Sequence, residues 1–308
     1  MSADSPIPAV EWLSTQGCNL RCRHCAPRAG KPAPNELETA EVQALFGQLS
    51  EFGVERIHIS GGEFTTRSDW HELLALALRS FAQVTLTTNA LLGQPLGRAL
   101  VEIEGKERLH VSVSLDGGEL VHDRRRSRGS YAAALALLAE IGSLSKEIIT
   151  TVARDNLGEL MHLREVCLVR GVPCWTIQPG LAMGRLAPEE ALDSAGRRAL
   201  QEAVRSLQAE AGAALRIIAP PTTERDGAEP CRCGRDHVVI RPDGRVAACV
   251  FIDDAGMGDL RSQSFAEIWR GQRMRAFRLE AARGCVALSH LGAGASRAEG
   301  EPPAAGEA

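Results

Sequence analysis

Three cysteines lie within eight positions near the start of the sequence, at Cys18, Cys22 and Cys25 in the stretch CNLRCRHC. Thiolates at this spacing can bind soft or borderline metals. The sequence has nine cysteines, an odd number, and no secretory signal, which argues for metal or redox use and against a disulfide framework. The cysteine run therefore predicts a metal centre.

Two kinds of metal centre could use these thiolates. A closed structural zinc site needs a fourth protein ligand, and His24 lies too close between Cys22 and Cys25 to be an obvious one. In a 4Fe–4S cluster three thiolates can hold three irons, and the fourth iron stays open to bind a ligand. The three thiols therefore favour the iron-sulfur cluster.

A second group of cysteines follows residue 220. The stretch HVVIRPDGRVAACV predicts two short strands around a Pro-Asp-Gly turn, and a hairpin that turns at Gly244 would bring cysteines at its two ends side by side. A helix around SFAEIWRGQRMRAF would let a last cysteine return to the site. A zinc knuckle could use the same four cysteines, which are Cys231, Cys233, Cys249 and Cys285.

The sequence predicts that alternating strands and helices position these cysteines. The strand-like runs are VEWLST, VERIHIS, QVTLTTN, RLHVSVSLD, EIITTVA and CWTIQP. Each is followed by a helical stretch, over residues 39–52, 68–80, 95–104, 130–142, 157–170 and 190–211. Six such units imply a parallel sheet with helices outside. Cys167 and Cys174, on a helix and at a strand start, are expected to be buried small apolar residues.

The predicted fold class is α/β, a partial (β/α)6 barrel of TIM type with a small C-terminal module of a β-hairpin and a helix. Six units are fewer than the eight that close a barrel. We expect the barrel domain over residues 1–215, the module over 216–290 and a disordered tail over 291–308, because the connector and the tail are rich in Pro and Gly. In such sheets chemistry lies at the C-terminal ends of the strands, where the first cysteine run falls.

Charge and hydropathy exclude two classes of partner. The formal net charge of -4 gives no global basic field that would attract nucleic acid or anionic lipid. The N-terminal stretch lacks the basic and apolar regions of a signal peptide, and no apolar run approaches the roughly 18 residues that would span a bilayer. We therefore expect a cytoplasmic protein with no nucleic-acid or membrane partner.

The stretch CNLRCRHC after a first strand resembles the signature of the radical S-adenosylmethionine (SAM) superfamily. In this family the open iron of a 4Fe–4S cluster chelates the amino and carboxylate groups of SAM. The resemblance spans residues 10 to about 211. It implies that Cys18, Cys22 and Cys25 hold such a cluster.

The segment SGGE at 60–63 is similar to the Gly-Gly-Glu element of the same family, which contacts the methionyl amine of SAM. The resemblance implies that Gly61 and Gly62 let the backbone approach closely and that Glu63 accepts from the ammonium. Phe64 stands where the family commonly has Pro. Because the residue at this position shapes a turn and is not a ligand, we expect the SAM site to form with Phe64 in place of Pro.

The segment SLDG at 114–117, with the later HD and RGS, is similar to the family's fourth-strand element. This similarity implies that Ser114 and Asp116 face the ribose or the methionine of SAM. Taken alone, Ser-Leu-Asp-Gly is typical of a strand end with a turn, and HDRRRSRGS is typical of a solvated basic loop. The order of the segments and their placement after strands favour the SAM-binding interpretation.

The gap from Cys233 through Gly244 to Cys249 resembles the C-x(9–15)-G-x4-C element of SPASM and Twitch modules, which carry auxiliary iron-sulfur clusters. Similarity to the C-x-x-G of these modules favours Cys231 as the first ligand and leaves Cys233 as an extra ligand or a spare. Full SPASM modules continue with more cysteines, whereas none follows Cys285. The resemblance therefore implies one auxiliary 4Fe–4S cluster.

The family resemblance implies an enzyme that cleaves SAM reductively to a 5'-deoxyadenosyl radical, which abstracts hydrogen from an unactivated C–H bond. Within the family, the SLDG segment joined to such a module favours modification of a ribosomally made peptide. The alternative substrate is a small molecule such as a cofactor precursor, a tetrapyrrole or a sugar. An iron-sulfur electron carrier or a zinc-binding scaffold is a further alternative, although neither has a use for SAM-facing residues.

The partners of such an enzyme are also expected from the resemblance. A flavodoxin- or ferredoxin-type protein would deliver the electron. Because the chain starts almost at the first expected strand, a peptide substrate would need a separate recognition protein or direct binding of its leader. No side chain is identified as a general acid, base or nucleophile.

Overall fold

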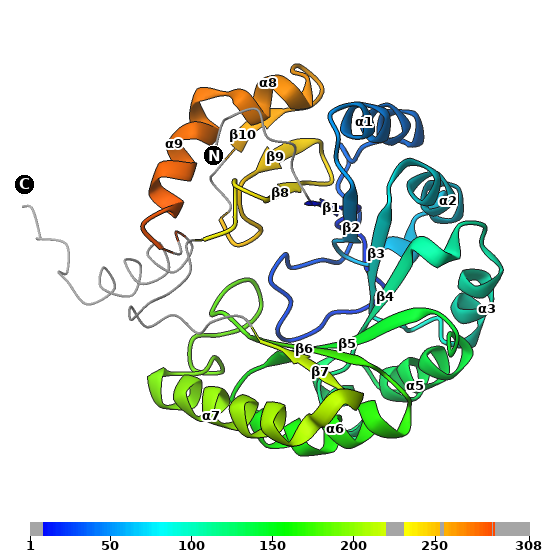
Figure 1. Ribbon diagram of the computed structural model, residues 1–308, viewed down its shortest axis with the longest axis vertical. Helices are drawn as coiled ribbons and strands as arrows, with labels where there is room; N and C mark the ends of the chain where they lie inside the picture. The colour runs from blue at the N-terminus through cyan, green and yellow to red at the C-terminus, as the bar shows by residue number, and fades with distance from the viewer. Residues whose placement is uncertain (1–8, 220–230, 253–255, 285, 287–308) are drawn as a thin grey trace, which may run out of the picture.

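The computed structural model describes residues 9–219, 231–252, 256–284 and 286, which form one curved sheet with helices on its outer face (Figure 1). The strands are β1 (Ala9–Leu13), β2 (Arg56–Ser60), β3 (Gln83–Thr88), β4 (Leu109–Ser114), β5 (Ser145–Val152), β6 (Cys174–Pro179), β7 (Arg216–Ile218), β8 (His237–Ile240), β9 (Arg245–Ala247) and β10 (Gly256–Asp259). Their order in the sheet is β10-β9-β8-β1-β2-β3-β4-β5-β6-β7. Pairing is parallel from β8 through β1 to β7 and antiparallel among β8, β9 and β10.

Helices connect the strands and cover the convex face of the sheet (Figure 1). The α-helices are α1 (Thr39–Glu51), α2 (Trp70–Ser80), α3 (Gln94–Glu102), α4 (Glu119–Arg125), α5 (Ser130–Glu140), α6 (Leu160–Val169), α7 (Ser194–Ala211), α8 (Phe265–Arg270) and α9 (Gln272–Ala281). Short 3-10 helices are η1 (Phe64–Thr66), η2 (Lys106–Arg108), η3 (Leu157–Glu159) and η4 (Gly212–Ala214). Within the described ranges, no helix combines the length and the apolar character needed to cross a membrane.

Side chains alternate along each strand, which separates an apolar outer face from a polar inner face. In β1, Val10 and Trp12 are fully buried in the main core, and the Trp12 ring packs edge-on against Phe46 of α1 at 5.4 Å. Glu11, between them, lies on the opposite face and accepts a hydrogen bond from Ser60 of β2 at 2.7 Å. The outer face therefore holds the helices, and the inner face leaves polar groups inside the barrel.

The partial barrel expected from the sequence is confirmed, with additions that short apolar patterns did not reveal. A seventh parallel strand, β7, pairs with β6 after the last helix of the barrel. Helix α4 lies in the segment interpreted from sequence as part of a strand-end element. The single C-terminal helix is in fact two, α8 and α9, which meet at Gly271. Three residues of β7 and seven of α4 are too few for a periodic pattern to stand out.

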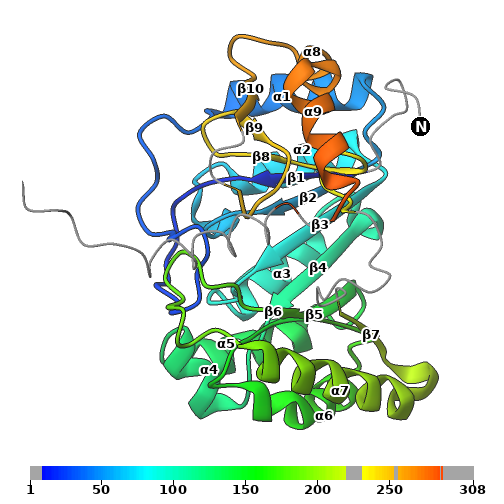
Figure 2. The ribbon, with the colours of Figure 1, turned by 90° about the vertical axis from the view of Figure 1, so that its left-hand side faces the viewer.

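The C-terminal hairpin continues the barrel sheet (Figure 2). Strand β8 pairs in parallel with β1, with Val238 beside Val10, and Phe265 of α8 packs against Phe52, the residue that follows α1, with ring centroids 5.2 Å apart. The hairpin therefore shares the sheet and the core with the barrel. The division into domains at 1–215, 216–290 and 291–308 stays a prediction, and residues 291–308 lie outside the described residues.

Candidate functional site

The first cysteine run lies in the long connection between β1 and α1, at the C-terminal end of the sheet. Cys18 N donates to Gly30 O at 2.8 Å, which closes the run into a loop. Cys18, Cys22 and Cys25 all line one cavity of ≈ 140 Å³. The structure therefore brings together the three thiols that the sequence placed only along one segment.

The donor set of this cavity fits a three-thiolate iron-sulfur cluster. Burial raises the pKa of Cys18 to about 11. Burial also raises the pKa of Cys22, and the guanidinium groups of Arg126 and Arg185 oppose this rise. Metals bind the thiolate form of cysteine. The two cations therefore favour the charged state that a cluster needs at an otherwise buried thiol.

The Gly-Gly turn after β2 packs against the start of the cysteine loop and lines the same cavity. Gly62 N donates to Thr15 O at 2.7 Å, and a Cβ on Gly62 would lie 2.0 Å from Gly17 O. Gly61 adopts a φ of 119°, in the region that favours glycine. The glycines are thus required for close approach of two backbone segments, and their expected contact with SAM stays a prediction.

Glu63 follows this turn, and its carboxylate is buried behind the cavity. It accepts hydrogen bonds from Thr65 Oγ1 at 2.8 Å, from Thr88 Oγ1 at 3.0 Å and from Asn89 N at 2.7 Å. Burial raises its pKa, which these donors partly counteract. Glu63 therefore joins the ends of β2 and β3, and its contact with the methionyl amine stays a prediction.

Phe64, the departure from the family pattern, lies in η1 with its side chain fully buried. Its ring packs edge-on against Trp12 at 6.0 Å and against Trp70 at 6.5 Å. The aromatic residue therefore belongs to the core beneath the site, and the turn that carries the glycines forms with it in place.

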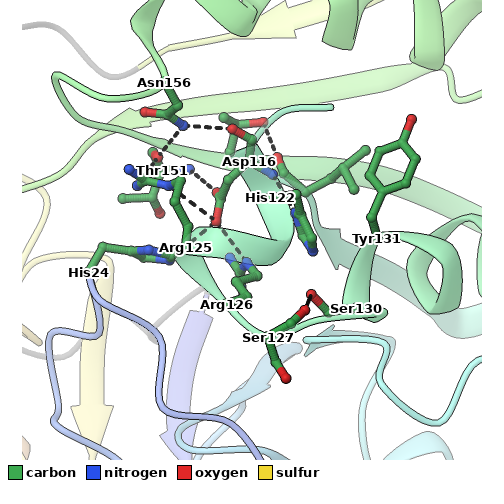
Figure 3. Close-up of polar contacts among 12 residues, drawn as sticks. His24, Asp116, His122, Arg125, Arg126, Ser127, Ser130, Tyr131, Thr151 and Asn156 are labelled. Carbon is green, nitrogen blue, oxygen red and sulfur yellow. Dashed lines mark hydrogen bonds and ion pairs between the residues drawn. The ribbon is translucent and has the colours of Figure 1, made fainter. Parts of the chain in front are cut away.

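Ser114 and Asp116, at the end of β4, have different surroundings. Ser114 lines the cavity. The Asp116 carboxylate is fully buried and accepts from Arg126 Nε at 2.7 Å and from Thr151 N at 3.0 Å (Figure 3). His24 Nε2, from the cysteine loop, lies 3.3 Å from the same carboxylate. Asp116 thus connects β4, β5, α4 and the cysteine loop.

The charges around Asp116 stabilise its ionised form. Burial would raise the pKa of Asp116, but the guanidinium groups of Arg126 and Arg125 outweigh burial and hold the pKa well below its usual range. Burial in turn lowers the pKa of His24 to about 3, so its ring is neutral at physiological pH. In the network of Figure 3, the buried carboxylate of Asp116 pairs with the guanidinium of Arg126 and lies 4.0 Å from that of Arg125, which also pairs with Asp155.

Among the cavity-lining residues that sequence reasoning missed, three carry a guanidinium or amide group. Arg126, whose side chain is 8% exposed, is placed by α4 from the basic run HDRRRSRGS. Asn89 follows β3, and its Nδ2 lies 3.7 Å from Cys18 Sγ. Arg185 arrives from the connection after β6. The position of Asn89 directly after the strand QVTLTT was a usable signal, whereas the two arginines had none beyond their charge.

The second cysteine group also comes together. The thiol of Cys233 forms hydrogen-bonding contacts with the thiols of Cys231 and Cys249, and these contacts raise the pKa of Cys233. The contact between Cys233 and Cys249 lowers the pKa of Cys249. Gly244, with a φ of 86°, occupies the turn between β8 and β9. Cys285 lies outside the described residues, and which of these thiols bind a metal stays a prediction.

A second cavity, of ≈ 410 Å³, lies at the N-terminal ends of β1 to β3 and is lined by Cys233. Between the two cavities, His58 Nε2 lies 2.7 Å from Thr87 Oγ1, and Glu11 bridges Ser60 and His237 at 2.7 Å and 3.4 Å. Thr87 and Ser60 line the first cavity, and His58 and His237 line the second. The two cysteine groups therefore border one polar barrel interior. Cys167 and Cys174 are both buried.

Comparison with protein families gives two matches. The radical SAM superfamily matches residues 12–165, and an iron-sulfur cluster-binding domain, SPASM, matches residues 231–287. The family resemblance stated from the motifs is thereby confirmed for both parts of the chain. Both families support bound iron-sulfur clusters.

Curated relatives include enzymes of two kinds. Mycofactocin maturase MftC of Mycobacterium ulcerans is 30% identical over 290 residues, covering 87% of this chain and 75% of that protein. Sporulation killing factor maturation protein SkfB of Bacillus subtilis is 27% identical, covering 94% and 71%. AdoMet-dependent heme synthase of Nitratidesulfovibrio vulgaris is 25% identical, covering 88% and 81%.

A solved structure supports the same fold. SuiB of Streptococcus suis bound to the precursor peptide SuiA matches with a TM-score of 0.72 at 17% identity, covering 89% of this chain and 67% of that chain. This likeness is one of architecture. It agrees with a partial barrel extended by a C-terminal module.

Proposed function

The chain belongs to the radical SAM superfamily, and from this premise we propose that it modifies a ribosomally made peptide. One observation carries the proposal: the cysteine loop, the glycine turn after β2, Ser114 after β4 and the guanidinium of Arg126 all line one cavity. When bound there, a 4Fe–4S cluster supplies the electron for reductive cleavage of SAM, and the 5'-deoxyadenosyl radical takes hydrogen from the substrate. Similarity to two maturation proteins supports the peptide as substrate.

We propose the following division of roles among the residues of the cavity. Cys18, Cys22 and Cys25 hold the cluster. Gly61, Gly62 and Ser114 contact SAM through close backbone approach and a hydroxyl group. Asp116 orients Arg126, whose guanidinium borders the cavity as a cation suited to a carboxylate. A flavodoxin- or ferredoxin-type protein supplies the electron.

Mass spectrometry of peptide products tests the substrate class. The reconstituted protein is incubated with SAM, dithionite and a short peptide encoded beside its gene, and both 5'-deoxyadenosine and the mass of the peptide are followed. We expect a peptide-dependent rise in 5'-deoxyadenosine together with a mass change. In a parallel incubation, a porphyrin precursor replaces the peptide. An unmodified peptide together with a modified porphyrin precursor would favour the small-molecule class of substrate, which the similarity to heme synthases supports.

Glu63→Gln is expected to weaken SAM binding about ten- to a hundredfold while the cluster stays in place, because it removes the carboxylate that is proposed to accept from the methionyl amine of SAM. Binding of SAM to the reconstituted variant is measured by equilibrium dialysis, with iron content determined in parallel. Glu159→Gln is the matched control, since Glu159 is a carboxylate that accepts from Gly118 N at 2.7 Å at another strand end, away from the Gly61-Gly62 turn that lines the cavity. Equal SAM affinity in both variants would reduce Glu63 to a structural residue.

The second cysteine group is proposed to hold one auxiliary 4Fe–4S cluster, with Cys231, Cys233, Cys249 and Cys285 as candidate ligands. The wild-type protein should then bind about eight irons, and the variant with Ala at positions 18, 22 and 25 about four. Iron and zinc are measured by mass spectrometry after anaerobic purification. Cys231→Ala and Cys233→Ala are also measured separately. If one of these cysteines is not a ligand, its replacement should leave the iron content unchanged. Zinc without iron in the triple variant would make this group a structural knuckle.

A further inference from the structure

The connection between β6 and α7, residues 180–193, reaches the cysteine loop of β1. A single residue of this connection makes three hydrogen bonds to that loop. Arg185 N donates to Cys25 O at 3.0 Å, Arg185 Nε to Cys22 O at 2.8 Å and Arg185 Nη1 to Ala29 O at 3.0 Å. These bonds link the ends of two strands that are separated by four others in the sheet.

The residue before Arg185 shows how close this approach is. Gly184 has a φ of 59°, and a Cβ there would lie 2.2 Å from Ala26 O and 2.3 Å from Cys25 O. Only glycine fits so near another backbone in this conformation. In return, Arg28 Nε of the cysteine loop donates to Gly184 O at 2.9 Å. The two connections are therefore joined from both sides.

The bonds from Arg185 are shorter than the cysteine loop's own bonds in the same segment. Cys25 N donates to Cys22 O at 3.3 Å, and Arg28 N donates to Cys25 O at 3.4 Å, both longer than the usual 2.9–3.0 Å. The carbonyls of Cys22 and Cys25 thus have better partners outside the loop than within it. The β6–α7 connection therefore supplies the shorter hydrogen bonds to these two carbonyls.

The guanidinium of Arg185 also brings charge to the cavity, which it lines. Cys18, Cys22 and Cys25 line the same cavity, so this guanidinium borders the proposed cluster site. A fixed cation close to an iron-sulfur cluster favours the state with the extra electron, because that state is more negative. Arg185 therefore combines two effects, one geometric and one electrostatic.

We propose that Arg185 is a positioning residue of the cluster site, which holds the segment from Cys22 to Ala29 in its ligating conformation and raises the reduction potential of the cluster. This inference rests on the proposed binding of an iron-sulfur cluster by Cys18, Cys22 and Cys25. Its two effects are separable, because Lys keeps the charge of Arg but cannot reach two carbonyls with a planar fork.

The test compares Arg185→Gln and Arg185→Lys with the wild type in the full reconstituted chain. The readouts are the midpoint potential of the SAM-responsive electron paramagnetic resonance signal and the rate at which a chelator removes that signal. Arg185→Gln should lose the cluster about tenfold faster and have a lower midpoint potential, because it loses both bonds and charge. Arg185→Lys should also lose the cluster faster but keep a potential near that of the wild type.

Arg154→Gln is the matched control. Arg154 Nε donates to Ala191 O at 2.9 Å and Arg154 Nη2 to Asp193 Oδ2 at 2.8 Å, so it anchors the same connection at its far end, and its side chain is 51% exposed. This variant should match the wild type in both readouts. If Arg185→Gln behaves like Arg154→Gln, the inference is wrong.

Three further outcomes are decisive. If Arg185→Gln takes up no cluster, the rate of cluster loss in Arg185→Lys is the deciding measurement. A rate equal to that of the wild type would show that Arg185 does not hold the segment from Cys22 to Ala29 in place. A wild-type protein without a SAM-responsive signal would instead defeat the proposed function itself. A normal wild-type signal with unaffected variants would defeat only the role of Arg185.

Discussion

Replacing Cys22 by Ala should abolish the formation of 5'-deoxyadenosine. Cys22 is the most enclosed of the three thiols that line the first cavity, with 8% of the residue exposed, and each thiolate of an open cluster holds one iron. Loss of one thiolate would leave two irons without a protein ligand, so the cluster would not be held in place to bind SAM. The variant is reconstituted anaerobically and assayed with SAM and dithionite by liquid chromatography.

The control for this experiment is Cys167→Ala. Cys167 is a fully buried thiol on α6, belongs to neither cysteine group and packs in the main core. Its replacement removes one sulfur at a cost of about 1 kcal/mol in the free energy of unfolding and should leave 5'-deoxyadenosine formation intact. A normal yield from Cys22→Ala would refute the assignment of the first cluster, whereas equal losses in both variants would trace the effect to folding.

Asp116→Asn should destabilise the protein by about 3–5 kcal/mol, since it removes the buried carboxylate that pairs with the guanidinium of Arg126 at 2.7 Å. The side chain of Arg126 is 8% exposed and would keep its charge without this carboxylate, whereas Arg125 keeps its ion pair with Asp155. Asn preserves the shape and one acceptor, so packing stays nearly constant. Urea unfolding at neutral pH measures the difference in the free energy of unfolding.

The pH dependence of the same variant provides a second measurement. The pKa of Asp116 is depressed in the folded state, so its stabilising contribution is complete above the ordinary pKa of about 3.9 and is lost as the pH falls below that value. The gap in stability between wild type and Asp116→Asn should therefore narrow under acid. A gap that stays constant down to strongly acid pH would contradict the ionised network.

Asp193→Asn is the matched control for Asp116→Asn. Asp193 pairs with Arg154 at 2.8 Å, but both side chains are more than half exposed. It also caps α7 by accepting from Gly196 N, a role that Asn performs equally well. This exposed pair should contribute at most about 1 kcal/mol. Equal urea midpoints for the two variants would mean that the buried charge network adds nothing.

Much of the fold could be predicted from the sequence, because its information is local. Alternating apolar residues in runs such as VERIHIS and RLHVSVSLD indicate strands, and the helices between them carry their own periodicity. The expected and observed helices agree within a few residues, as for 39–52 against Thr39–Glu51. The hairpin around Gly244 was likewise predictable, since a Pro-Asp-Gly turn between two apolar runs is a local signal.

Elements whose stability comes from their neighbours could not be predicted. Strand β7 has three residues and exists because β6 offers a free edge, with Cys174 beside Arg216. The pairing of β8 with β1 joins residues more than 220 positions apart, which no periodicity describes. Short elements and sheet neighbours are selected by tertiary packing, which overrides weak local preference.

The candidate site divides in the same way. The sequence by itself determined the thiols and the glycines, because ligand spacing and backbone freedom are properties of consecutive residues. Only the tertiary structure decided that Arg126 and Arg185, from α4 and from the connection after β6, face Cys22. A long cationic side chain can point to solvent or inward with little change in local sequence pattern, and what turns these two inward is the carboxylate of Asp116 and the carbonyls of the cysteine loop.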